Sequence, residues 1–179
     1  ALIGLILAYP FTYLEYCLMM RYGGGSEARA RSRIENWLLL HRDWHLQLYR
    51  TPAGLRLMAV HATFDPADPI VAKFFRAIGA DPVYARMCLR QNCFRARVSP
   101  KPWRIGIGPH IRPQSVWPID PEKLPERRRW LDEYEHKAKD FSACQYLDSL
   151  GSGLLHPKVH DVQRWHDELC RARVPLPSA

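Results

Sequence analysis

Two alternating stretches of this sequence bring acid–base and anion-binding side chains onto one face of a predicted β-hairpin. WHLQLYR and LRLMAVHATF are rich in strand-forming residues and are separated by TPAG, which predicts strands over 44–50 and 55–63. In the register that this turn sets, Leu48 faces Leu57 on the core side of the hairpin. The opposite face then carries four residues with functional side chains: Asp43, His45, Tyr49 and Arg56.

The polar face of this hairpin could carry acid–base chemistry. His45 lies close to Asp43 and can act as a general base, and Tyr49 is a further candidate catalytic residue. Arg56 can hold a phosphate or carboxylate group. The spacing fixes neither a nucleophile nor a second carboxylate, however, and a polar, solvated sheet face is the alternative interpretation. The sequence therefore leaves open whether the protein is an enzyme.

Three histidines near the C-terminus have the residue type of a metal site but only part of the spacing. His156 and His160 are four residues apart and can share one side of a helix, with His166 as a third candidate ligand. His156 precedes Pro157 and fits a helix cap, however, and His166 lies near the apolar stripe of that helix. We therefore predict no metal site, and the sequence names no cofactor.

The five cysteines are scattered and form no C-x-x-C pair. An odd number without such pairs argues against a disulfide framework and against a zinc ribbon. Cys88 and Cys93 are close enough in sequence to pair across a turn, and their disulfide state stays open. Scattered cysteines of this kind are typically small, buried apolar side chains.

Positive charge is concentrated in the middle of the chain. The protein carries 26 Lys and Arg residues against 18 Asp and Glu residues, a formal net charge of +8. No acidic residue lies between Asp81 and Asp120, and this interval holds seven Lys and Arg residues. Such a segment predicts contact with an anionic partner, either nucleic acid or acidic lipid. The candidate anion-binding residues are Arg56, Arg95, Arg97, Lys101 and Arg104.

Two features weigh against a nucleic-acid platform in this basic segment. Its arginines can instead pair with the acidic residues of the helix predicted over 124–141. Trp103 is expected to anchor the loop to the body of the protein rather than to stack on a base.

The remaining patterns predict an α+β fold in which helices pack on one face of a small antiparallel sheet. FRARV predicts a third strand over 94–98, with Phe94, Ala96 and Val98 inward and its arginines outward. Six prolines make 99–121 a long irregular loop. Five helices are expected, at 27–42, after Asp68-Pro69, after Asp81-Pro82, at 124–141 and at about 157–172.

Residues 1–25 combine an apolar segment with a glycine-rich joint. Residues 1–20 carry one charge, Glu15, and are about long enough to cross a bilayer, and several arginines follow. This pattern predicts a membrane anchor that holds 26–179, as a single domain, on the cytoplasmic side. Pro10 and Glu15 favour the alternative, in which the segment is a core helix of a cytoplasmic protein.

No strong catalytic or nucleotide-binding motif is present in the sequence. We therefore expect a non-catalytic domain, tethered to a membrane, that binds an anionic partner through its basic face. The alternative is a small enzyme that acts on a phosphorylated or acidic substrate through His45, Asp43 and Arg56. The sequence specifies neither the ligand nor the oligomeric state.

Overall fold

The structure, a computed structural model, describes residues 25–108 and 110–179. The apolar segment predicted as an anchor, residues 1–20, lies outside the described residues. Among the helices of the described part, none combines the length and the apolar character needed to cross a bilayer.

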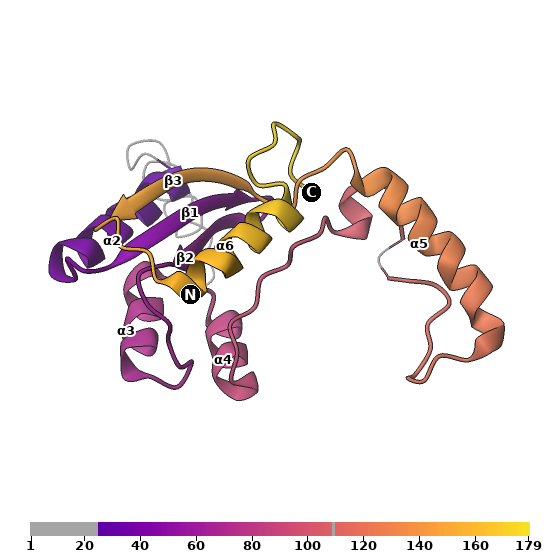
Figure 1. The fold of residues 1–179 in the computed structure, drawn as a ribbon, viewed down its shortest axis with the longest axis horizontal. Helices are drawn as coiled ribbons and strands as arrows, with labels where there is room; N and C mark the ends of the chain where they lie inside the picture. The colour runs from indigo at the N-terminus through magenta and orange to yellow at the C-terminus, as the bar shows by residue number, and fades with distance from the viewer. Residues whose placement is uncertain (1–24, 109) are drawn as a thin grey trace, which may run out of the picture. The chain divides into compact units, whose positions relative to one another are not determined.

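The described residues form five α-helices and a three-stranded antiparallel sheet, which confirms the predicted α+β class (Figure 1). They fall into two compact units. One contains the described residues up to Asp43 together with Phe64–Phe94, and the other contains Trp44–Thr63 and Arg95–Ala179. The elements in chain order are α2 (Gly25–Leu40), β1 (His45–Thr51), β2 (Gly54–Ala59), α3 (Pro69–Ile78), α4 (Pro82–Gln91), α5 (Leu124–Ala138), β3 (Gln145–Gly151) and α6 (Pro157–Cys170).

The first unit is helical, and its helices begin where the sequence predicts. The carboxylate of Asp68 accepts a hydrogen bond from the Ile70 backbone N–H at 3.0 Å, and this caps α3. Asp81 caps α4 in the same way, through the Val83 N–H at 2.8 Å. Within this unit the ring of Trp37 on α2 packs against Phe74 on α3, with centroids 5.2 Å apart.

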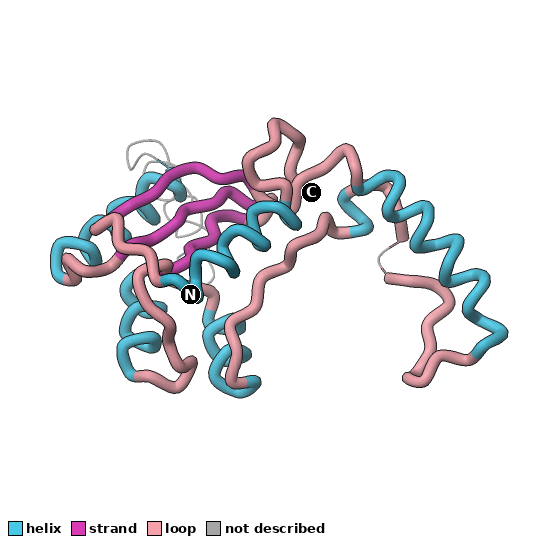
Figure 2. The backbone as a smooth tube through the Cα atoms, viewed as in Figure 1, coloured by secondary structure: helices cyan, strands magenta, loops and turns pink. Residues whose placement is uncertain are grey.

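The second unit contains the sheet, in which β1 lies between β2 and β3 (Figure 2). The predicted hairpin register is confirmed, because Leu48 pairs with Leu57 and Tyr49 pairs with Arg56. On the other side, Tyr49 pairs with Tyr146, whereas Leu48 pairs with Asp148. Leu147 is therefore an extra residue in β3, which forms a β-bulge next to Tyr49.

The third strand is not the one that the sequence predicted. Residues 94–98 form no strand, and β3 is Gln145–Gly151 instead. The backbone carbonyl of Arg97 accepts a hydrogen bond from the Arg56 side chain at 3.0 Å, so it is occupied outside any sheet ladder. Phe94, expected to point inward, is exposed, and only Val98 of the predicted apolar face packs against the core of this unit.

Strand β1 is buried on both of its faces. Leu46 and Leu48 are fully buried as expected, but His45, Gln47 and Tyr49 on the opposite face are buried too. Helix α6 runs along this second face (Figure 1), and the ring of His166 packs edge-on against Tyr49 with centroids 4.7 Å apart. The polar face of the hairpin is therefore not solvated, because α6 covers it.

Segment 99–121 is irregular, as its prolines predict. Among its described residues, the helical ones are the short 3-10 helix Pro102–Arg104 and the beginning of a second one, Pro121–Lys123. Trp103 does not anchor this segment, because half of its surface is exposed.

Gly151, at the end of β3, is required by the close approach of a neighbouring backbone. It has a φ of 110°, and a Cβ atom there would collide with the Trp44 carbonyl oxygen.

We expect Gly151→Ala to lower the free energy of unfolding by about 3 kcal/mol or more, measured by denaturant titration. Gly153 is the matched control, since it also has a positive φ but has open space around it. Gly153→Ala should cost only about 1 kcal/mol, and equal losses would contradict the steric explanation.

Candidate thiol site beneath helix α6

Helix α6 positions two of the three residues that form the candidate site. It begins at Pro157, after His156, whose Nδ1 accepts a hydrogen bond from the Lys158 N–H. His166 and Cys170 are four residues apart, so both side chains lie on the same side of the helix. That side faces the sheet, and only 4% of the His166 surface and 1% of the Cys170 surface are exposed.

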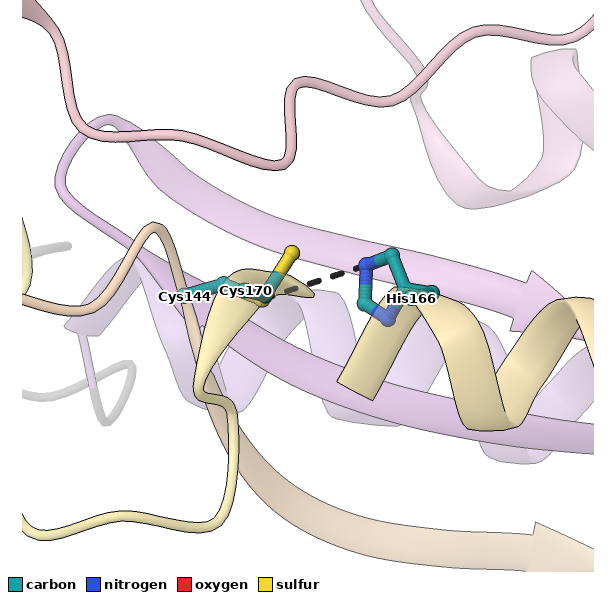
Figure 3. A group of neighbouring side chains, drawn as sticks. All are labelled: Cys144, His166 and Cys170. Atoms are coloured by element: carbon teal, nitrogen blue, oxygen red, sulfur yellow. Dashed lines mark hydrogen bonds between the residues drawn. The ribbon is translucent and has the colours of Figure 1, made fainter. Parts of the chain in front are cut away.

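The third residue, Cys144, comes from the segment that leads into β3. The backbone N–H of Ala143 donates to the carbonyl of Cys170 at 3.0 Å, which places the two cysteine-bearing segments side by side. The sulfur atoms of Cys144 and Cys170 and a ring nitrogen of His166 all lie within 4.8 Å of one another. Figure 3 shows the three side chains converging, with Cys144 Sγ 3.9 Å from His166 Nε2.

Arg56 of β2 brings a positive charge into this group. Its Nη1 lies 2.9 Å from His166 Nε2, 3.6 Å from Cys144 Sγ and 3.7 Å from Cys170 Sγ. Its Nη2 donates to the Arg97 carbonyl. Arg56 has no carboxylate partner in the part of the chain that the structure describes, so the two sulfur atoms are the only groups in contact with it that can become anionic.

Asp167 orients the imidazole of His166. Its Oδ1 lies 3.0 Å from His166 Nδ1, and its Oδ2 accepts a hydrogen bond from Arg173 Nε at 3.0 Å. In the neutral ring, Nδ1–H donates to Asp167, and Nε2 accepts from Arg56. Nε2 is therefore the nitrogen that faces the sulfur atoms.

The two cysteines have pKa values that move in opposite directions. The hydrogen bond from the Cys144 thiol, with smaller contributions from His166 and Arg56, outweighs burial and lowers the pKa of Cys170 to about 5. The Cys170 sulfur in turn holds the proton on Cys144, and together with burial it raises the pKa of the Cys144 thiol. These opposite shifts favour Cys170 over Cys144 as the thiol of the pair that ionises first.

The pKa values of the groups around the two cysteines are shifted as well. Burial alone would lower the pKa of His166, but the hydrogen bonds to Asp167 and Cys170 outweigh it and raise that pKa. Burial likewise opposes the ionisation of Asp167, but the hydrogen bonds from His166 and Arg173 outweigh it and lower its pKa. Burial and the Asp167 carboxylate raise the pKa of Tyr49, so this phenol stays protonated.

Two cysteines and a histidine are also the residue types that bind zinc. The spacing of their ligand atoms, within 4.8 Å, is compatible with one ion, and Asp167 on Nδ1 would act as the outer partner of the histidine. The position of Arg56 argues against an ion, because its guanidinium contacts all three ligand atoms and would repel a dication. We therefore interpret the group as a thiol site, with Arg56 as its cation.

The structure divides the hairpin residues predicted as a site between two places. Tyr49 and Arg56 join the thiol site, whereas His45 belongs to a separate buried network on the same sheet face. The Gly153 N–H donates to His45 Nδ1 at 3.0 Å, and His45 Nε2 lies 3.0 Å from Ser149 Oγ. Burial lowers the pKa of His45, which agrees with a neutral ring whose two nitrogens are both engaged.

The other predicted residues do not converge on this site. Asp43 is exposed and precedes β1. The side chains of Arg95, Arg97 and Arg104 are exposed and that of Lys101 is half-buried, so Arg97 contributes only its carbonyl. His156 caps α6 and His160 is exposed, so only His166 of the three candidate metal ligands belongs to the group.

Sequence reasoning missed Cys144, Cys170 and the role of Asp167. The signal that could have found two of them is the spacing HDELC, which places Cys170 one helical turn after His166 and Asp167. No local pattern marks Cys144, which reaches the group only because β3 pairs with β1.

Comparisons with protein-family models, with curated proteins and with solved structures each give no match for this chain. A functional assignment therefore depends on the chemistry of the site itself.

The ionisation of Cys170 can be measured by the ultraviolet absorbance of its thiolate as a function of pH. We expect one thiol to titrate at a pH of about 5, whereas an unperturbed cysteine titrates at about 8.5. Cys170→Ser should remove this step. Cys144→Ala should move it to higher pH because it removes the donor, and Cys144→Ser, which keeps a donor, should move it less. A wild-type titration with no step below neutral pH would contradict the thiolate assignment.

Proposed function

We propose that the protein is a thiol redox protein in which Cys144 and Cys170 interconvert between two thiols and a disulfide. The observation that supports this most directly is the contact of Arg56 with both sulfur atoms, at 3.6 and 3.7 Å. A guanidinium that is partly removed from water needs an anion, and a thiolate is the nucleophilic form of cysteine. The adjacent backbones of Ala143 and Cys170 support a link between the two sulfur atoms.

The reaction is a thiol–disulfide exchange with a small disulfide as the oxidant. The Cys170 thiolate attacks one sulfur of the substrate, a mixed disulfide forms, and the other half leaves as a thiolate. Cys144 then attacks the Cys170 sulfur, which forms the Cys144–Cys170 disulfide and expels the second half. Two protein sulfurs are oxidised, and one substrate disulfide is reduced to one thiol and one thiolate, with the proton of Cys144 on the thiol.

The electrostatics of the site support this order of attack. In the reduced protein, the negative charge of Cys170 keeps Cys144 protonated. Once Cys170 is part of a mixed disulfide, that charge is gone, whereas Arg56 stays 3.6 Å from Cys144 Sγ. Ionisation of Cys144 then becomes favourable, and its proton passes to the thiolate that has left the substrate.

The proposal predicts a single intramolecular disulfide when the reduced full chain is exposed to a small disulfide. Mass spectrometry should find a loss of two hydrogens, with Cys144 joined to Cys170 in peptide maps. Cys144→Ser should stop at the mixed disulfide on Cys170, and Cys170→Ser should suppress the reaction. Cys88→Ser serves as the control because Cys88, also buried, lies in the other unit and should leave the reaction unchanged.

Metal content separates this proposal from a zinc centre. Stoichiometric zinc in the purified protein, with Cys144 and Cys170 unreactive until a chelator removes the ion, would overturn the redox assignment.

We infer a second candidate function, binding of single-stranded nucleic acid, from the exposure of Trp103. Half of its surface is exposed, and the ammonium of Lys101 lies 5.1 Å from its ring centroid. Arg104, the next residue, is also exposed. An exposed aromatic ring between basic side chains favours stacking on a base with charge contacts to phosphates, and it favours nucleic acid over acidic lipid.

The second function predicts that the ring of Trp103 contributes to the binding of single-stranded nucleic acid. We expect Trp103→Ala to weaken binding of a labelled oligothymidylate by about tenfold, measured by fluorescence anisotropy, and added salt to weaken it steeply. Trp117→Ala is the control, because Trp117 is an equally large exposed ring in the same loop. Equal losses from both substitutions, or binding confined to acidic vesicles, would contradict the nucleic-acid interpretation.

A further inference from the structure

A shallow hollow of about 320 Å³ lies next to the thiol site. Its walls come from the start of β3 and from the segment after α6. Gln145 directly follows Cys144, and Ala172 lies two residues after Cys170. The lining residues are Gln145, Tyr146, Ala172, Arg173, Val174 and Pro175.

The hollow and the buried thiol cluster share part of their walls. Ala172 belongs to the core cluster that contains both cysteines and Tyr49, and Tyr146 packs against that cluster. The backbone N–H of Tyr146 donates to the Ala172 carbonyl at 2.8 Å, so these two residues form a joined part of the wall of the hollow. A molecule held in the hollow therefore contacts residues that also pack with Cys144 and Cys170.

Arg173 gives this hollow its chemical character. Its guanidinium lies 3.9 Å from the Tyr146 ring centroid, and its Nε–H donates to Asp167. Its side chain is 54% exposed, and within the described residues no hydrogen bond engages its two terminal nitrogens. A planar guanidinium with these two groups open to solvent suits a carboxylate, which it can bind through two parallel hydrogen bonds.

We propose that the hollow selects a small disulfide that carries carboxylate groups, and that Arg173 is the specificity-determining residue. This inference rests on the thiol redox function proposed above and names the class of substrate for that site. A carboxylate that binds Arg173 competes with Asp167, which also contacts His166 of the thiol site. An anionic disulfide thus both docks in the hollow and weakens the Arg173–Asp167 contact, whereas a cationic disulfide does neither.

Two disulfides of opposite charge test this selectivity on the reduced full chain. Dithiodiglycolate carries two carboxylates, and cystamine carries two amines. We expect Arg173→Gln to slow oxidation of the Cys144–Cys170 pair by dithiodiglycolate about tenfold more than it slows oxidation by cystamine. Arg173→Lys should restore part of the rate with dithiodiglycolate, because it keeps the charge but not the fork of donors.

Arg164→Gln is the matched control for charge. Arg164 lies on α6, is 53% exposed and pairs with Asp161 and Glu168, away from the lining of the hollow. It should leave both rates unchanged, and unfolding curves of all variants show whether the fold is intact. Equal effects of Arg173→Gln on both disulfides, or none on either, would overturn the role of Arg173. Failure of both disulfides to oxidise the wild-type pair would instead overturn the redox function itself.

Discussion

The arrangement of the second unit depends on the placement of one guanidinium group, that of Arg56, among groups that cannot hydrate it. Removing a positive charge from water costs several kcal/mol unless an anion or strong acceptors replace the lost solvent. Here the replacements are a backbone carbonyl, an imidazole nitrogen and two sulfur atoms. Because neither the carbonyl nor the neutral ring offers a full negative charge, only the sulfur atoms can supply a charge that balances Arg56. This constraint links β2, α6 and the segment before β3.

The surrounding residues form a chain of polar groups with an arginine at each end. Arg56 contacts the Cys170 sulfur, His166 lies between that sulfur and Asp167, and Asp167 binds Arg173 at the surface. The hydrogen bonds along this chain lower the pKa of Asp167 and raise that of His166. Formation of a mixed disulfide on one sulfur removes the charge of that sulfur, and the pKa values of the other groups then change. The site is therefore an electrostatic unit as well as a set of reactive side chains.

The features that were predicted correctly from the sequence are those that residues close together in the chain determine. The hairpin register followed from the TPAG turn and from alternation, and the starts of α3 and α4 followed from Asp68 and Asp81. The third strand was assigned wrongly because apolar and polar residues alternate in 94–98 as well as in 145–151. Only pairing with β1, which is distant in the sequence, decides between the two segments. The thiol site escaped for the same reason, since Cys144 and Cys170 meet through the sheet and not through spacing.

The bulge at Leu147 determines which changes in the sequence of β3 the thiol site can tolerate. With that extra residue, Tyr146 lies on the same face as Tyr49, while Ser149 keeps its place beside Gln47 on that face. Substitutions that preserve the length of β3 leave both pairings in place. Loss of the one extra residue would restore a regular ladder in which Tyr146 still pairs with Tyr49, whereas loss of a second residue would turn Tyr146 to the opposite side, away from Arg173 and the cysteines. The number of residues in β3, more than the identity of most of them, thus maintains the separation between the histidine network of His45 and the thiol chemistry beside it.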